Sequence, residues 1–181
     1  MRLEIEKDSV IDGVGVHAGD IVYLNDQGQF HRLDGPAHIQ TPNSNFTNKP
    51  NVWYKNGKIH RSGGPAIVFP VNHEERWCKN RVFHRLDGPA ITNVFGTDRK
   101  CWWIKGIDLS DERNFSQISR KRLMFLLARD PEAITACYRS DYEMQDLVLK
   151  QRPDLIGKIK DLNPEIAIKY KHELDLSKVD I

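Results

Sequence analysis

His31-Arg32-Leu33-Asp34-Gly35-Pro36-Ala37 is the stretch around which this chain is organised. The phrase returns as His60-Arg61-Ser62-Gly63-Gly64-Pro65-Ala66 and as His84-Arg85-Leu86-Asp87-Gly88-Pro89-Ala90, at offsets of 29 and 24 residues. Three copies of one seven-residue phrase predict a repeat array over the first half of the chain.

Each copy lies within a pattern of strands and turns, which is clearest in the second unit. Residues 52–55 are rich in aromatic and β-branched side chains, Asn56-Gly57 follows, and residues 58–61 return. Asn-Gly between two such runs favours a hairpin, because a type I′ turn needs positive φ at both central positions. A further turn at Gly63-Gly64 and a strand from Ala66 complete the unit. We therefore expect an antiparallel β-meander built from hairpin repeats.

The other units keep this order less regularly. The third unit turns near Asn80-Arg81, where Arg81 replaces the expected glycine, and a fourth begins at Lys100 without reaching a His-Arg phrase. Residues 41–50 form a loop rich in turn-forming residues, which accounts for the longer first offset. Loops of this kind often carry recognition.

The repeated His and Asp residues favour a structural role over a catalytic one. An active site needs its group once, whereas these groups recur, and Gly63 stands where the other units have Asp34 and Asp87. We expect the Asp to accept backbone N–H bonds, the Gly to supply positive φ, the Pro to fix φ, and the His ring to donate to a neighbouring turn. The residues assigned to this structural motif are His31, Asp34, Gly35, Pro36, His60, Gly64, Pro65, His84, Asp87, Gly88 and Pro89.

The aromatic residues of the array have two interpretations. They recur at one place in the unit, as Tyr23, Trp53, Tyr54, Trp77, Trp102 and Trp103. They can form a ladder of core contacts along the sheet, or some can be exposed as a binding stripe.

From Leu109 onward the pattern becomes helical. The run from Arg129 to Ile134 aligns with the run from Gln151 to Ile156 at an offset of 22 residues, and each contains a proline typical of a helix start. Ser140 to Glu143 fits a capping box. We expect short helical-hairpin repeats here. The overall prediction is an α+β protein, with a β-hairpin repeat domain over residues 1–108 and an α-helical repeat domain over residues 109–181.

Composition narrows the functional classes. The chain has 181 residues and a net charge of +2, without the concentrated basic surplus that is usual in nucleic-acid binders. Cys78, Cys101 and Cys137 are odd in number and widely spaced, which argues against a disulfide framework or a structural zinc site and favours reduced thiols. No apolar stretch has the length of a membrane span, and no signal-peptide core follows Met1. We expect a soluble, cytoplasmic protein.

The repeat also carries a family resemblance. The phrase His-Arg-x-Asp-Gly-Pro-Ala, preceded by Trp-Tyr-x-Asn-Gly-Lys, resembles repeat proteins of tailed bacteriophages and giant viruses, which are similar in style to MORN-type β-hairpin arrays. It covers about residues 20–110, and the Pro-Glu-x-Ile units resemble short α-repeats of phage proteins. Gly63, Arg81 and the degenerate first unit depart from the pattern. The resemblance implies a phage or viral origin, and it brings no enzymatic activity.

These observations predict a non-enzymatic interaction protein that binds a host protein, to inhibit or redirect it. We expect no catalytic residue, no bound cofactor or metal ion, and no association with a membrane. The candidate partner-binding residues are Phe46, Trp53, Trp77, Trp102, Trp103, Arg120, Lys121 and Arg122. The three basic residues at 120–122 can instead form a solvated helix face.

The alternative is a nucleic-acid or nucleotide binder, in which aromatic side chains stack on bases between basic ones. Self-association is also open, because the ends of a β-meander expose strand edges.

Overall fold

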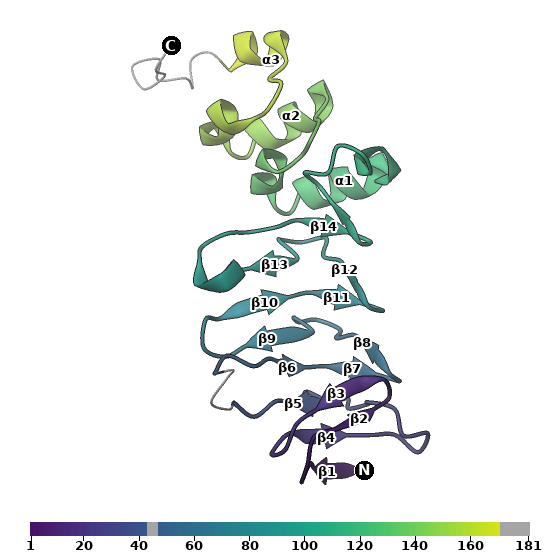
Figure 1. Ribbon diagram of the computed structural model, residues 1–181. Coiled ribbons are helices and arrows are strands. Elements are labelled where there is room, and N and C mark those ends of the chain that lie inside the picture. Colours follow the sequence, from purple (N-terminus) through teal and green to yellow (C-terminus); the bar gives the residue numbers. More distant parts are fainter. Residues whose placement is uncertain (43–46, 171–181) are drawn as a thin grey trace. The chain divides into compact units, whose positions relative to one another are not determined.

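The computed structural model describes residues 1–42 and 47–170 (Figure 1). Its contacts divide the chain into two compact units. The first holds Met1–His84 and Ala90–Lys100, and the second holds Arg85–Pro89 and the chain from Cys101 onward. An antiparallel sheet dominates the first unit and helices dominate the second, which confirms the predicted α+β class. The predicted boundary after residue 108 lies inside the second unit.

One antiparallel sheet forms the framework of the first unit. Its strand order is β1-β4-β5-β6-β9-β10-β13, and Figure 1 shows these strands stacked like rungs. The strands are β1 (Arg2–Glu4), β4 (Ile21–Tyr23), β5 (His38–Ile39), β6 (Asn51–Val52), β9 (Ile67–Phe69), β10 (Glu74–Arg76) and β13 (Ile91–Thr92). Each strand is short, so the sheet depends on pairing along the whole stack.

Two-stranded hairpins accompany the sheet. They are β2 (Ser9–Ile11) with β3 (Val14–Val16), β7 (Tyr54–Lys55) with β8 (Lys58–Ile59), β11 (Cys78–Lys79) with β12 (Val82–Phe83), and β14 (Trp103–Ile104) with β15 (Ile107–Asp108), the last in the second unit. The central turn residues all have positive φ: Asp12-Gly13, Asn56-Gly57, Asn80-Arg81 and Lys105-Gly106. Arg81 therefore adopts a φ of 73° that glycine adopts at less cost.

The first unit has its main apolar core near the N-terminal strands. Val22, Phe30 and Ala37 are fully buried there. The ring of Phe30 stacks with that of Tyr54, with ring centres 4.9 Å apart, and with that of His38, with ring centres 5.5 Å apart. The copies of the motif alanine are all buried, and their backbones hydrogen-bond to neighbouring segments of the stack: Ala37, Ala66 and Ala90.

The helices of the second unit follow a regular spacing. They are the 3-10 helix η2 (Phe115–Gln117), α1 (Arg120–Leu127), the 3-10 helix η3 (Pro131–Thr135), α2 (Tyr142–Leu149), the 3-10 helix η4 (Pro153–Lys158) and α3 (Pro164–Lys169). The offset of 22 residues seen in the sequence separates the starts of α1, α2 and α3, and also those of η3 and η4. The segments that begin at Pro131 and Pro153 are 3-10 rather than α-helical.

Local contacts in the second unit correct one predicted cap. Asp141, rather than Ser140, is the N-cap of α2, because its carboxylate accepts the backbone N–H of Met144 at 3.0 Å. The core of this unit includes Leu126, Leu149 and Trp102, whose indole N–H donates to Asp130 at 2.7 Å. No helix within the described part of the chain is long and apolar enough to cross a membrane.

Candidate functional site

The arginine of the repeated phrase lies flat on an aromatic ring. The guanidinium carbon of Arg32 is 4.0 Å from the centre of the Tyr23 ring, and that of Arg61 is 4.2 Å from the centre of the Trp53 ring. The same arginines donate from Nη1 to the carbonyls of Pro36 and Pro65, at 3.5 and 3.2 Å. A cation–π contact and a backbone hydrogen bond therefore hold each guanidinium in place.

The motif glycine makes room for this arginine, which differs from its predicted role. Gly35, Gly64 and Gly88 do not have positive φ; only the neighbouring Gly63 does, at 74°. A Cβ atom at any of the three would lie 2.8 to 2.9 Å from the guanidinium carbon of the motif arginine. Glycine stands at this position because a side chain would displace the arginine.

The motif histidine also differs from expectation. His31 does not donate to the adjacent turn; its Nδ1 accepts the backbone N–H of Asn56, in the β7–β8 turn, at 3.2 Å. The next turn residue, Gly57, donates its N–H to the carbonyl of Phe30 at 3.0 Å, and Arg81 donates likewise to Ile59. Residues at the start of the first and second copies therefore support the hairpin turn of the following unit.

The motif aspartate pairs with the motif arginine rather than mainly with the backbone. Arg32 Nε donates to Asp34 at 2.8 Å, and Arg85 Nε donates to Asp87 at 2.7 Å. The Arg32 guanidinium is the main cause of the lowered pKa of Asp34. The second copy has Gly63 in place of an aspartate, and no carboxylate of the described residues pairs with Arg61.

A cavity of about 340 Å³ opens beside Arg61. Its walls come from the first two copies of the phrase and from the strand between them, and consist of Arg32, Leu33, Asp34, Trp53, Lys55, His60, Arg61 and Ser62. Leu33 on the wall of this cavity is 79% exposed. Since Asp34 is already paired with Arg32, the cavity has an excess of positive charge from Lys55 and Arg61.

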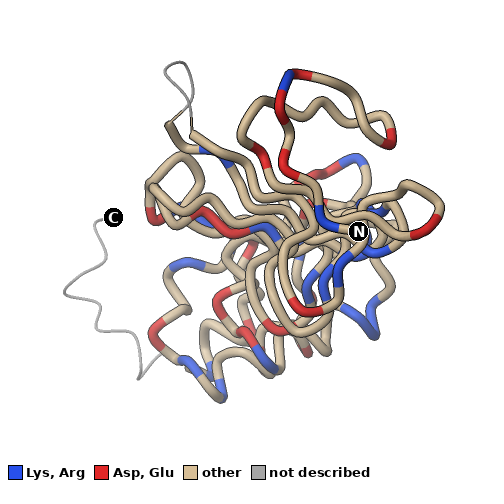
Figure 2. Tube along the Cα trace, turned by 90° about the horizontal axis from the view of Figure 1, so that it is seen from below, with Lys and Arg blue, Asp and Glu red and all other residues tan. Residues whose placement is uncertain are grey.

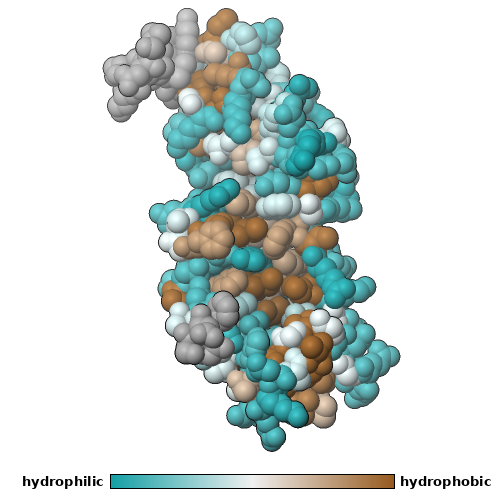
Figure 3. All heavy atoms as spheres, in the orientation of Figure 1, coloured by the Kyte–Doolittle hydropathy of each residue, from teal (hydrophilic) through white to brown (hydrophobic). Residues whose placement is uncertain are grey.

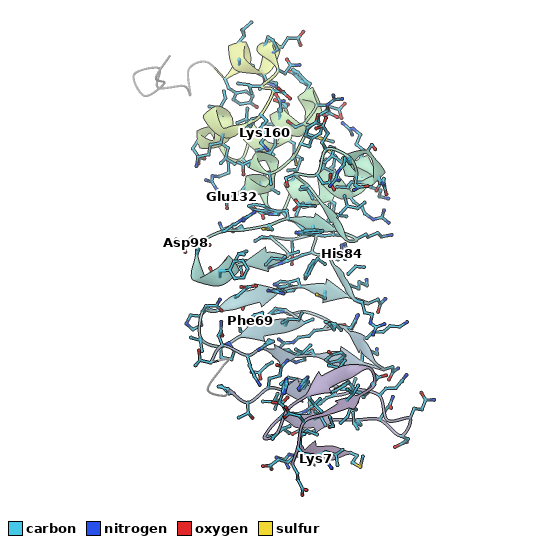
Figure 4. All side chains as sticks on the ribbon, viewed as in Figure 1. Lys7, Phe69, His84, Asp98, Glu132 and Lys160 are labelled. Carbon is cyan, nitrogen blue, oxygen red and sulfur yellow. The ribbon has the colours of Figure 1, made fainter. Side chains whose placement is uncertain are left out.

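A second exposed feature of the first unit lies at the end of the stacked strands that is remote from the β7–β8 hairpin. Figure 4 shows Phe69 and Asp98 at one end and His84 at the other. At the Phe69 end, the β9–β10 turn carries Val71, which is 63% exposed, and the 3-10 turn η1 (Val94–Gly96) carries Phe95, which is 85% exposed. The two turns lie close together, since a Cβ atom added at Gly96 would lie 3.4 Å from Cβ of Asn72. We call Val71 and Phe95 the sheet tip.

The sheet tip is held in an unusual backbone conformation. His73, Asn93 and Phe95 all have positive φ, between 53° and 56°. The buried carboxylate of Glu74 accepts the N–H of Phe95 at 2.9 Å and pairs with Arg76 at 2.6 Å. A left-handed conformation at an aromatic residue costs free energy, so the surrounding contacts must impose it. Sequence reasoning missed Phe95; its signal is Asn93-Val94-Phe95-Gly96, which the other units lack.

A buried Asp–His pair lies near the N-terminal strands. His38 Nε2 is 2.9 Å from Asp20 Oδ2, and both side chains are inaccessible to solvent. The same carboxylate accepts the N–H groups of His17 and Thr41 at 3.0 and 2.8 Å. Burial alone raises the pKa of Asp20, but these hydrogen bonds outweigh it, so the pKa lies below its ordinary value. The pair joins loops to the sheet, since His38 lies in β5 whereas Asp20, His17 and Thr41 lie outside its strands.

The aromatic partner-binding candidates are only partly exposed or buried. Trp53 lies half-buried beneath Arg61, and Trp77 and Trp103 are also half-buried. Trp102 belongs to the core of the second unit, which excludes it as a surface residue. Phe46 lies outside the described residues.

The basic candidates of α1 lie in the second unit. Arg120 is tied to Asp141 and Glu143 by ion pairs. Lys121 and Arg122 line a cavity of about 340 Å³, together with Leu86, Ser119 and Phe125. The guanidinium of Arg129 covers the Phe125 ring at 3.4 Å.

The chemistry available to the cysteines is limited. Cys78, Cys101 and Cys137 are free thiols in the structure, and burial raises the pKa of Cys78 to about 11 and that of Cys137 to about 12. Such thiols are poor nucleophiles at neutral pH. Within residues 1–42 and 47–170, no group of three or more His, Cys, Asp or Glu side chains is placed to hold a metal ion.

Comparison with known proteins adds no relative: no family model, curated protein or solved structure matches this chain.

Proposed function

We propose that this chain is a non-enzymatic protein-binding module whose first unit docks on a partner through the sheet tip. The observation that carries the proposal is Phe95, an aromatic side chain that is 85% exposed in a backbone conformation imposed by buried Glu74. A rigidly presented aromatic residue contributes large contact area at little cost in conformational entropy, which is typical of binding hot spots.

Apolar surface next to the sheet tip supports the same proposal. Figure 3 shows hydrophobic side chains (brown) gathered over β9, β10 and β13. Ile67, Val68, Phe69 and Ile91 in these strands are only partly buried. Contiguous apolar surface with a polar rim marks interaction sites. The partner that this proposal assigns is a protein of the host cell, since the repeats resemble those of phages and giant viruses.

The test removes the ring while keeping the backbone. Asn tolerates positive φ better than most residues, so we expect Phe95→Asn to leave the melting temperature unchanged or raised. Affinity purification from host lysate followed by mass spectrometry compares this variant with the wild type. A stoichiometric partner captured by the wild type and lost with Phe95→Asn supports the proposal. Val10→Thr is the control, because Val10 is 72% exposed but lies in β2.

Two results would count against the proposal. Wild-type chain that captures no stoichiometric partner contradicts protein binding itself. A partner captured equally well by Phe95→Asn contradicts the role of the sheet tip and moves the interface elsewhere. Once a partner is identified, its own activity in the presence of this chain distinguishes inhibition from redirection.

A nucleic-acid-binding function is the second candidate, because exposed basic side chains gather at the end of the stacked strands where the hairpins β7–β8 and β11–β12 lie. We call this the hairpin end. In the first unit these residues are Lys55, Lys58, Arg61, Lys79 and Arg81. Figure 2 shows Lys and Arg positions (blue) concentrated toward the side on which Figure 1 shows β7, β8, β11 and β12. Arg32 and Arg61, however, already cover Tyr23 and Trp53, which reduces the ring surface open to bases.

Salt dependence decides between the two functions. If the hairpin end binds nucleic acid, affinity for single-stranded or duplex DNA must fall steeply with salt, by roughly one power of salt concentration per phosphate contacted. A shallow slope, or no binding near physiological salt, excludes this function.

A further inference from the structure

The second copy of the phrase lacks a carboxylate that the first and third copies supply. Arg32 and Arg85 donate from Nε to Asp34 and Asp87, at 2.8 and 2.7 Å. Arg61 sits on Trp53 and donates to Pro65 in the manner of Arg32, yet Gly63 replaces its aspartate. Among the described residues, no acidic side chain pairs with Arg61.

The space beside Arg61 is open rather than filled. The cavity of about 340 Å³ is bordered by Arg61, His60 and Ser62 of the second copy and by Arg32, Leu33 and Asp34 of the first. A Cβ atom at Gly63 would meet no atom within 4 Å. Arg61 is exposed, and Lys55 on the same cavity has no ion-pair partner among the described residues.

We propose that this cavity binds the side-chain carboxylate of an acidic residue of a partner protein, with Arg61 Nε taking an external carboxylate in place of the missing aspartate. This rests on the proposed function, in that the chain binds a protein. A carboxylate is favoured over a phosphate because it is the group that Arg32 and Arg85 bind in the other two copies. Lys55 adds a second positive charge, and exposed Leu33 offers apolar contact to the rest of an acidic peptide.

The guanidinium is already oriented for this ligand. The Trp53 ring covers one face of Arg61, Gly64 lies against the guanidinium, and the bond to Pro65 fixes Nη1. Little rotamer freedom remains to be lost on binding, so a charge-assisted hydrogen bond at Nε is stronger than at a freely moving surface arginine.

The test uses a small probe, so that it does not depend on finding the partner. N-acetylaspartate N-methylamide is titrated into the full, ¹⁵N-labelled chain at constant ionic strength, and the Nε–Hε signals of the arginines are followed. We expect a saturable shift of the Arg61 signal and a smaller one for Arg32, whose Nε is engaged by Asp34. N-acetylasparagine N-methylamide, which is neutral but otherwise matched, is the control ligand and should cause no such shift.

Two variants locate the site. Arg61→Gln should weaken binding of the acidic probe by about tenfold or more, the effect of losing a hydrogen bond to a charged group. Gly63→Asp should weaken it similarly, because it restores a carboxylate within the chain, and Asp is among the residues that best tolerate positive φ. Arg81→Gln is the matched control, since Arg81 is an exposed arginine on the neighbouring hairpin. Melting curves confirm that each variant is folded.

Several results would overturn the inference. If Arg61→Gln or Gly63→Asp binds the acidic probe with the affinity of the wild type, the probe does not bind at Arg61. Equal shifts with the neutral probe show that no charge is recognised. Tighter binding of inorganic phosphate than of the acidic probe, at equal ionic strength, would show that the ligand of the cavity is a phosphate rather than a carboxylate. Because the probe is not a protein, loss of host-protein capture in Phe95→Asn and loss of probe binding in Arg61→Gln are independent outcomes.

Discussion

The guanidinium of Arg61 lies 4.2 Å from the centre of the Trp53 ring, while the backbone of Gly64 leaves no room beside it for a Cβ atom. This relationship explains why the phrase places glycine three residues after arginine. Contact with the arginine side chain, rather than the backbone conformation of the turn, therefore requires glycine at this position of the phrase.

Gly64→Ala tests this constraint. The new Cβ would lie 2.9 Å from the guanidinium carbon of Arg61, at the end of a flexible side chain that can move away. We expect the free energy of unfolding to fall by about 1 kcal/mol, from loss of the cation–π contact and the bond to Pro65. Urea denaturation measures this change. Gly15→Ala, where a Cβ meets nothing within 4 Å and φ is not positive, should change stability little; an equal loss there would contradict the explanation.

Arg81→Gly tests the strain in the β11–β12 turn. Arg81 has a φ of 73°, and its backbone N–H bond to Ile59 does not depend on its side chain. Relief of the left-handed conformation should raise the free energy of unfolding by about 1 kcal/mol. The reciprocal change, Gly13→Ala, places a side chain at the same φ in open space and should lower it by a similar amount. A lower melting temperature for Arg81→Gly would show that the arginine side chain stabilises the turn.

Asp20→Asn tests the buried Asp–His pair. The change leaves His38 and the N–H groups of His17 and Thr41 without an ionised acceptor, and it should lower the free energy of unfolding at pH 7 by about 3 kcal/mol. Asp26→Asn, in an exposed turn, should have little effect and serves as the control.

The pH dependence of the Asp20→Asn effect has a definite sign. The pKa of Asp20 is lower in the folded chain than its ordinary value of 3.8. Its stabilising contribution is therefore fully present above that ordinary value and is lost as the pH falls toward the folded pKa. The difference between wild type and variant in urea denaturation should be large at pH 7 and smaller near pH 3. A difference independent of pH would rule out the ionised carboxylate as its source.

Gln145→Leu tests the polar link between α2 and the loop before α3. The Gln145 amide is fully buried; it donates to Asp161 O at 3.2 Å and accepts the N–H of Asn163 at 2.9 Å. Leucine leaves both backbone groups without a partner, so we expect a loss of about 2 kcal/mol in thermal or urea unfolding. Gln151→Leu is the matched control, because Gln151 is exposed and donates only to Leu147 O among the described residues. Equal effects would contradict a special role for Gln145.

The turns and helix starts follow from local chemistry, and the sequence therefore indicates them. Asn56-Gly57 suits positive φ at both positions, and the two residues have φ of 49° and 69°. Pro131 and Pro153 begin helical turns, but the sequence does not distinguish 3-10 from α-helix there, because the two differ by one residue in hydrogen-bond spacing.

The candidate surfaces could not be predicted in the same way. Phe95 is presented by a carboxylate from β10, twenty-one residues earlier in the chain, and nothing in the residues around Phe95 shows that Glu74 reaches its N–H. The open cavity beside Arg61 likewise depends on two copies of the phrase lying next to each other. Trp102 illustrates the reverse case: as a partner-binding candidate it was wrong, because it is part of a core, which is the other interpretation that the sequence allowed for these aromatic residues.

The sequence by itself determined the α+β class, the order of turns and the recurrence of one phrase, because these depend on φ preferences and on residues close together along the chain. Only the tertiary structure decided why that phrase contains its glycine, which aromatic rings are covered, and where Phe95 and Arg61 stand exposed. Those properties depend on side chains that meet between rungs of the stack. Contacts of that kind are set by packing and desolvation, which local sequence does not specify.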